Sequence, residues 1–149
     1  MGARTLVSKV LVVALLGLTA VFAGGASAAA GGCAGNGTAS GSPGFVKSGS
    51  TTQTVTVNAS VKCQGTPSGA IVGRGALTGN CTALNGTLTL SGALNGTVVV
   101  ATHAAAFTLK GTLNNHPFTG AGAFAPKTGN CVTTPLTAAT VAFAGAFTT

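Results

Sequence analysis

The sequence contains no aspartate and no glutamate. This absence excludes several classes of active site and metal site. Without side-chain carboxylates, the chain cannot build a paired-acid glycosidase site, an aspartic-protease dyad, a Ser-His-Asp triad or a carboxylate calcium site. Lysine and arginine then leave a formal net charge of +7. We therefore expect a basic protein that is not an enzyme of these classes.

Large aromatic side chains are also scarce, because tryptophan and tyrosine are absent and only seven phenylalanines occur. Most of the apolar residues are alanine and valine, so each buried position removes little surface from water. A core of such small side chains needs reinforcement, and the four cysteines are expected to supply it as two disulfides. The expected disulfide residues are Cys33, Cys63, Cys81 and Cys131.

The pairing of these cysteines is limited by the expected hairpins. A turn around Pro67 would carry Cys81 away from Cys63, which disfavours a bridge between those two. We favour Cys33 with Cys63 and Cys81 with Cys131. The pairing of Cys33 with Cys81 and of Cys63 with Cys131 stays open.

Residues 1–28 have the features of a cleaved secretory signal peptide. Arg4 and Lys9 give a positive start, residues 10–22 form an apolar run, and Ala28 ends a small-residue cleavage site. The run is shorter than the roughly 20 apolar residues of a membrane span. We expect a secreted, extracellular or cell-envelope protein without a transmembrane span after signal removal. Lipid attachment at Cys33 is an alternative, disfavoured because it leaves an odd number of cysteines.

The mature chain is expected to consist of an irregular arm and one β domain. Residues 29–50 are rich in glycine and serine and predict an irregular arm, with one short strand around Phe45. Residues 51–149 predict an all-β domain. In residues 54–63 apolar and polar residues alternate, which is typical of a half-buried strand whose inner face carries valines.

Asn-Gly pairs suggest the next turns, at residues 85–86 and 95–96. A two-residue turn at Asn95 and Gly96 sets a register in which Leu88 lies opposite His103. That register puts Val99, Ala101 and His103 on the apolar face that points to the core. His103 is therefore the one candidate ligand-binding residue, against the simpler interpretation of a core histidine with a hydrogen-bond partner.

Two more strands are expected near the C-terminus, and together these elements define the fold class. Residues 118–125 place Phe118 and Phe124 on one side, and residues 136–147 place Phe143 opposite a row of alanines. No helical period occurs outside the leader. The sequence predicts a small antiparallel barrel or sandwich of six to eight strands, with the barrel favoured because glycines suit strongly curved strands.

A weak internal repeat links two of the expected strands. In each copy a glycine-spaced strand leads into Thr-Gly-Asn-Cys, at residues 78–81 and 128–131. If the repeat is real, Cys81 and Cys131 occupy equivalent hairpin ends.

The functional prediction is a binding or interaction module with an unknown ligand and no cofactor. The expected partners are an anionic polymer, a glycan or a protein at the cell surface, because the chain is basic but carries no nucleic-acid motif. One alternative is a surface-assembling structural protein. Another is a ribonuclease-like enzyme that uses His103, His116 and Lys110. No metal site is expected, because no two of Cys63, Cys81, His103 and His116 are close in sequence.

Overall fold

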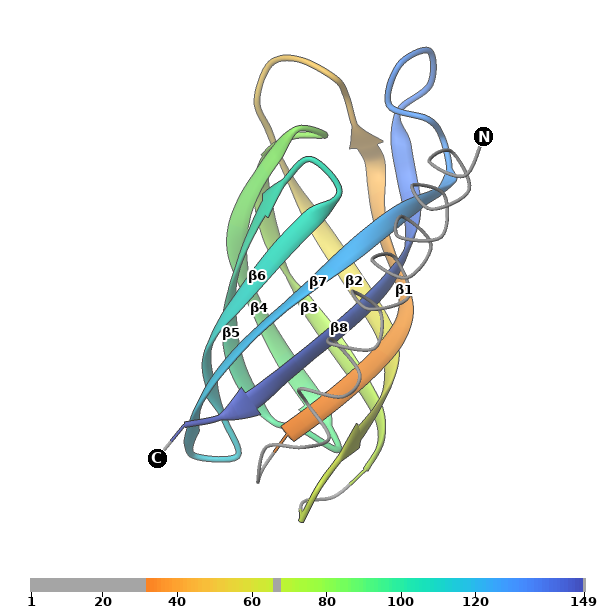
Figure 1. The fold of residues 1–149 in the computed structure, drawn as a ribbon. Coiled ribbons are helices and arrows are strands. Elements are labelled where there is room, and N and C mark those ends of the chain that lie inside the picture. Colours follow the sequence, from red (N-terminus) through yellow and green to blue (C-terminus); the bar gives the residue numbers. More distant parts are fainter. Residues whose placement is uncertain (1–31, 66–67, 149) are drawn as a thin grey trace, which may run out of the picture.

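The computed structural model describes residues 32–65 and 68–148, which form a closed antiparallel β-barrel (Figure 1). Its eight described strands follow the chain order around the ring, and β8 pairs with β1 to close it. The strands are β1 (Gly32–Phe45), β2 (Thr51–Cys63), β3 (Gly69–Asn80), β4 (Ala83–Gly92), β5 (Gly96–His103), β6 (Ala106–Leu113), β7 (His116–Thr128) and β8 (Leu136–Phe147). The predicted all-β class is confirmed, and the architecture is a barrel. The predicted signal peptide lies outside the described residues.

Alternation of residue type gives several strands an apolar inside and a polar outside. Strand β2 is the clearest case, with threonine, asparagine and serine outside, while its inner face carries Val55, Val57, Ala59 and Val61. Successive side chains of a strand point to opposite faces, so only a period-two sequence can serve both environments. The predicted inner face of this strand is confirmed.

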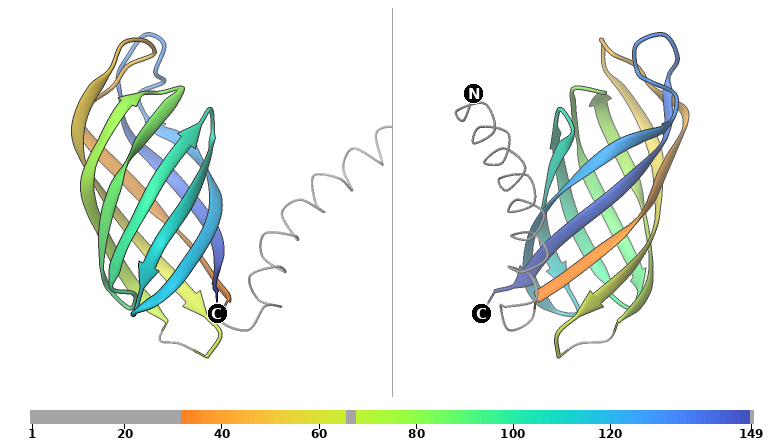
Figure 2. Two further views of the ribbon diagram at one scale, coloured as in Figure 1. Left: turned by 90° about the vertical axis from the view of Figure 1, so that its left-hand side faces the viewer. Right: turned by 45° about the vertical axis from the view of Figure 1, so that its right-hand side comes forward.

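The strands are steeply staggered around the ring (Figure 2). Gly41 on β1 has a Cα partner on β2, which in turn has a partner on β3, and so on around the ring. This series of partners ends at Phe147 on β8. The neighbouring Ala146 pairs with Gly32, at the opposite end of β1. A closed barrel requires this stagger because its strands tilt against the axis.

Inward-facing glycines allow neighbouring strands to approach closely enough for a narrow ring. A Cβ added at Gly75 would overlap the carbonyl oxygen of Thr87 on β4. A Cβ added at Gly37 would overlap the carbonyl oxygen of Asn58 on β2. These positions exclude any side chain, which explains why glycines interrupt otherwise aliphatic inner faces.

The prediction of an irregular arm over residues 29–50 is wrong for most of that segment. Residues 32–45 form β1, which pairs with β2 on one side and β8 on the other. Its inner face carries mostly glycine and alanine, so the apolar alternation that marks β2 is missing from the sequence. Pairing with two neighbours, rather than intrinsic strand preference, holds this segment extended.

The turns expected at the Asn-Gly pairs are also wrong. Asn85 and Gly86 lie inside β4, and Gly96 is the first residue of β5. Leu90 pairs with Gly96, so the β4–β5 loop is longer than two residues. A two-residue turn occurs instead at Asn114 and Asn115, whose φ angles are 50° and 64°. Asparagine tolerates this left-handed conformation, so an Asn-Asn pair can form the same kind of turn as Asn-Gly.

The two ends of the barrel differ in their covalent links. At the upper end of Figure 1 lie the loops that follow β1, β3, β5 and β7; at the lower end lie the other loops and the start of β1. Cys33 and Cys63 are directly opposed across β1 and β2 at the lower end, and they form one disulfide. Cys81 and Cys131 form the other at the upper end. This is the favoured pairing, and it leaves the Cys33 sulfur unavailable for a lipid.

The repeated Thr-Gly-Asn-Cys segments both lead into connections at the upper end. Gly79 and Gly129 both have positive φ, 140° and 87°. The Oδ1 atom of Asn80 accepts hydrogen bonds from the backbone of the turn that follows, and Asn130 does the same in the β7–β8 loop. Cys81 and Cys131 thus both lie at hairpin ends, as expected, and are joined to each other, but the β3–β4 connection is much shorter than the β7–β8 loop.

Candidate ligand cavity

The barrel interior contains a cavity of about 140 Å³. Six inward-facing apolar side chains from the central part of the barrel line it and remain partly accessible, although they point away from the outer surface. They are Val57, Leu90, Leu109, Phe124, Val141 and Phe143. Three of their Cα partners are Gly73, Gly120 and Gly122. Large side chains cover some of these glycines, as Leu90 covers Gly73, and the space that remains among the side chains constitutes the cavity.

Both ends of the interior are packed more tightly than the centre. At the lower end, Leu94, Leu113 and Phe118 each keep only 1% of their surface exposed. Leu94 lies in the β4–β5 loop, and its side chain packs into the lower end of the interior. A two-residue turn at Asn95 and Gly96 would instead place Leu94 at the end of the strand. At the upper end, Phe45, Leu84 and Leu136 are 5–8% exposed. The cavity is therefore a central, partly enclosed chamber between two more tightly packed layers.

The upper layer is held by a buried side-chain amide. Gln53, 6% exposed, accepts a hydrogen bond at Oε1 from the Gly44 backbone N–H at 2.7 Å. Its Nε2 atom donates to the Gly44 carbonyl oxygen, and also to Thr51 Oγ1 at 3.2 Å. Gln53 thereby ties Gly44 to β2 beyond the last β1–β2 pair, Gly41 with Val55, where the β1–β8 register on the other side of β1 shifts between Ser40 and Phe45. Its inward position follows from the parity of β2.

Loops from three parts of the chain meet above this layer. The Cys81 backbone N–H donates to the Val46 carbonyl oxygen at 2.9 Å. The Phe45 carbonyl oxygen lies 3.3 Å from Cys81 Sγ and 3.5 Å from Cys131 Sγ. The disulfide thus joins the β3–β4 turn to the β7–β8 loop directly beside the end of β1, and it braces the upper end.

Polar groups in the cavity wall are few and uncharged. The lining side chains with hydroxyl groups are Ser40, Thr102 and Thr137, and no lining residue carries a charge. The cations Lys47, Lys62, Arg74, Lys110 and Lys127 are all exposed. A ligand in this chamber meets hydrocarbon surface on nearly every side.

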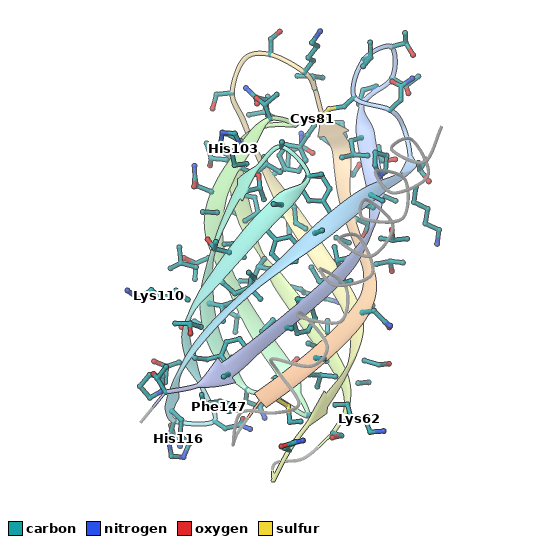
Figure 3. The ribbon with its side chains drawn as sticks, viewed as in Figure 1. Lys62, Cys81, His103, Lys110, His116 and Phe147 are labelled. Atoms are coloured by element: carbon teal, nitrogen blue, oxygen red, sulfur yellow. A yellow bond between two sulfur atoms is a disulfide. The ribbon has the colours of Figure 1, made fainter. Side chains whose placement is uncertain are left out.

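The expected position of His103 is wrong. In β5 the inner face carries Val98, Val100 and Thr102, whereas Val99 is 54% exposed and His103 is exposed at the strand end (Figure 3). Valines occupy three consecutive positions here, so alternation alone cannot assign the faces. The correct register follows from the longer β4–β5 loop. The prediction that His103 contacts a ligand stays a prediction, and it now concerns the outer surface.

The residues proposed for a ribonuclease-like site do not come together. His103 lies near the upper end and His116 near the lower end, where its ring contacts Phe147 at a centroid distance of 6.2 Å (Figure 3). Lys110 is exposed on β6, paired with Val99 and Thr119. Two histidines at opposite ends of a barrel cannot act as acid and base on one phosphodiester. This alternative is therefore wrong for a single chain.

The alternative of a surface-assembling protein requires strands with exposed, unpaired edges that could stack between molecules. The segment that suggested stacking forms β5 and β6, and each of these strands pairs on both sides. No strand within residues 32–65 and 68–148 has an unpaired edge, because the barrel is closed. Closed barrels remove the edges that template stacking.

Comparisons with known proteins identify no relative that would assign a function to the cavity. The chain matches no protein-family model, no curated protein and no solved structure. In the described part of the chain, no three His, Cys, Asp or Glu residues group as metal ligands would. Nor do those residues include a helix with the length and hydropathy of a membrane span. The function is therefore argued from the cavity.

Proposed function

We propose that this protein is an exported binding protein that holds one small, uncharged, apolar molecule inside its barrel. The observation that carries the proposal is the central chamber of about 140 Å³ with its hydrocarbon walls. Eight-stranded barrels have interiors just wide enough for side chains or for one small ligand. An engineered cavity of about 150 Å³ with comparable walls binds benzene or xenon.

The energetic cost of an unfilled chamber supports the same proposal. Enclosed cavities in protein cores cost about 24 cal/mol per Å³, so roughly 3 kcal/mol is an upper bound for leaving this partly enclosed chamber unfilled. A ligand that fills it restores the lost dispersion contacts. The absence of charge in the lining favours neutral ligands, because an ion would lose its hydration without a compensating partner.

The predicted signal peptide and the two disulfides support a location outside the cytoplasm. Disulfides persist in oxidising compartments, and both bridges here are compatible with such a location. In that setting the braced barrel would carry or sense a small molecule that partitions out of water. The cavity has about the size that accommodates benzene, which has six non-hydrogen atoms.

Benzene and xenon are the probes that test this proposal directly. Titrated into the oxidised protein, each is expected to shift the NMR signals of methyl groups of Leu109 and Val141 saturably. For benzene we expect a Kd on the order of 1 mM, equivalent to about 4 kcal/mol. Shifts confined to outer methyls such as those of Val99, or no saturable shift up to the solubility limit of benzene, would contradict the proposal.

A matched pair of variants ties binding to the chamber. Val57→Phe adds a ring on the inner face of β2, where Val57 lines the chamber opposite Ala39 and Gly73. It is expected to abolish benzene binding while the barrel stays folded. Val99→Phe makes the same change on the outer face of β5, where Val99 is 54% exposed. This control should bind benzene as the wild type does.

A further inference from the structure

The one hydroxyl on the inner face of β5 belongs to Thr102, and its hydrogen bonds distinguish it from the other two in the lining. Ser40 is exposed. The Thr137 hydroxyl donates to the Thr128 carbonyl oxygen at 3.4 Å. Thr102 alternates with Val98 and Val100 and therefore points into the upper part of the chamber. It places a polar atom among aliphatic and aromatic neighbours.

The Thr102 hydroxyl is used only as an acceptor by the protein. Its Oγ1 atom receives a hydrogen bond from the Leu84 backbone N–H at 2.8 Å. This bond replaces the next step of the β4–β5 ladder, whose register ends at Asn85 and Ala101. A hydroxyl also has one proton to donate. Among the described residues, that proton has no hydrogen-bond acceptor, and Thr102 is one of the residues that line the chamber.

We propose that the ligand combines an apolar body with one uncharged hydrogen-bond acceptor, and that Thr102 is the specificity-determining residue that binds this acceptor. The inference rests on the proposed function. A carbonyl or ether oxygen fits, because it can accept the Thr102 proton while the rest of the molecule contacts Leu109, Phe143 and their neighbours. A carboxylate does not fit, because one hydrogen bond cannot compensate its lost hydration. The class is therefore small neutral ketones, esters, lactones and ethers.

The sharpest test uses two ligands of one shape. Cyclohexanone and methylenecyclohexane differ in whether oxygen or CH₂ is attached to the ring by a double bond. Their Kd values are measured by NMR titration with wild type and with Thr102→Val, which keeps the volume and removes the hydroxyl. We expect Thr102→Val to weaken cyclohexanone about five- to tenfold, as the loss of one neutral hydrogen bond implies. The Kd of methylenecyclohexane should change less than about twofold, since it offers no acceptor.

Thr102→Ser is the matched control, because it retains the hydroxyl and should retain the preference for the ketone. Thr102→Val also removes the acceptor of the Leu84 N–H, so a second measurement uses the wild type alone. There, cyclohexanone is expected to shift the Leu84 amide signal more than methylenecyclohexane does, through the shared Oγ1 atom.

The outcomes separate this inference from the proposed function. If both ligands bind but Thr102→Val weakens them equally, and the Leu84 amide responds equally to both, the assignment of Thr102 is overturned and the apolar chamber stands. If neither ligand binds and benzene also fails, the proposed function falls and this inference falls with it. Selective loss of the ketone in Thr102→Val, with retention in Thr102→Ser, supports the inference.

Discussion

At the scale of single residues, glycine rather than any large side chain determines what this barrel can be. Gly37 and Gly75 lie where the neighbouring strand's carbonyl oxygen occupies the place of a Cβ. Gly41 is different, because a Cβ there would meet Val55 at 3.5 Å and Phe45 at 3.6 Å, which are ordinary contacts. The inner glycines therefore divide into positions that exclude a side chain and positions that merely lack one.

This division predicts opposite effects of one substitution. Gly75→Ala should destabilise the barrel by about 3 kcal/mol or more, because the added methyl forces two strands apart. Gly41→Ala should change stability by less than about 1 kcal/mol, with a small gain from the lower entropy of the unfolded chain. Urea unfolding of the two variants beside the wild type measures both. Equal destabilisation would show that close strand approach is not the reason for glycine at position 75.

At the scale of elements, the junction of β1 with β8 depends on a side chain. The ladder between these strands shifts register between Ser40 and Phe45, and the β7–β8 ladder shifts between Pro126 and Thr128. The first residues of β8 thus lie between two irregular ladders. The bonds from Gln53 to Gly44 bridge the gap from the opposite side of β1. We expect this junction to be the least stable part of the wall.

Removing the amide tests that expectation. Gln53→Met retains much of the length of the side chain but leaves the Gly44 N–H and carbonyl without partners, which costs about 1–3 kcal/mol. Hydrogen exchange of the Gly44 amide should accelerate strongly, while the Val141 amide in the regular part of the same ladder changes less. Thr51→Val removes only the weaker contact to Gln53 Nε2 and serves as the control. Unchanged protection of Gly44 in Gln53→Met would refute the bridging role.

At the scale of the whole molecule, we expect the missing carboxylates to make the barrel insensitive to acid. Acid unfolding usually arises because paired native carboxylates become protonated or because buried neutral histidines become charged. This chain has no Asp or Glu, and both His103 and His116 are exposed. Neither route is open to it.

The melting temperature at pH 3 is therefore expected to lie within about 5 °C of that at pH 7, a difference of roughly 1 kcal/mol. Calorimetry at the two pH values measures it. Val100→His supplies the contrast, because Val100 is 6% exposed on the inner face. Its imidazole would be buried neutral and would have to charge, so that variant should lose stability as the pH falls. A large drop for the wild type would contradict the prediction.

Much of the wall could be predicted from sequence because alternate residues face water and a dry interior. This reasoning assigned the faces of β2, β7 and β8, and it led from a weak core to two disulfides. It failed for β1, whose inner glycines carry no apolar signal, and for β5, whose three successive valines suit either face. In each failure the neighbouring strands, not the local sequence, decide the outcome.

The sequence by itself determined the all-β class, the excluded carboxylate chemistry and the need for sulfur bridges, since these follow from residue type and local period. Only the tertiary structure decided the closure of β1 onto β8, the inward position of Thr102 and the chamber beside it. Closure depends on pairing between segments far apart in the chain. A cavity is the space left among side chains from many strands, so no single segment encodes it.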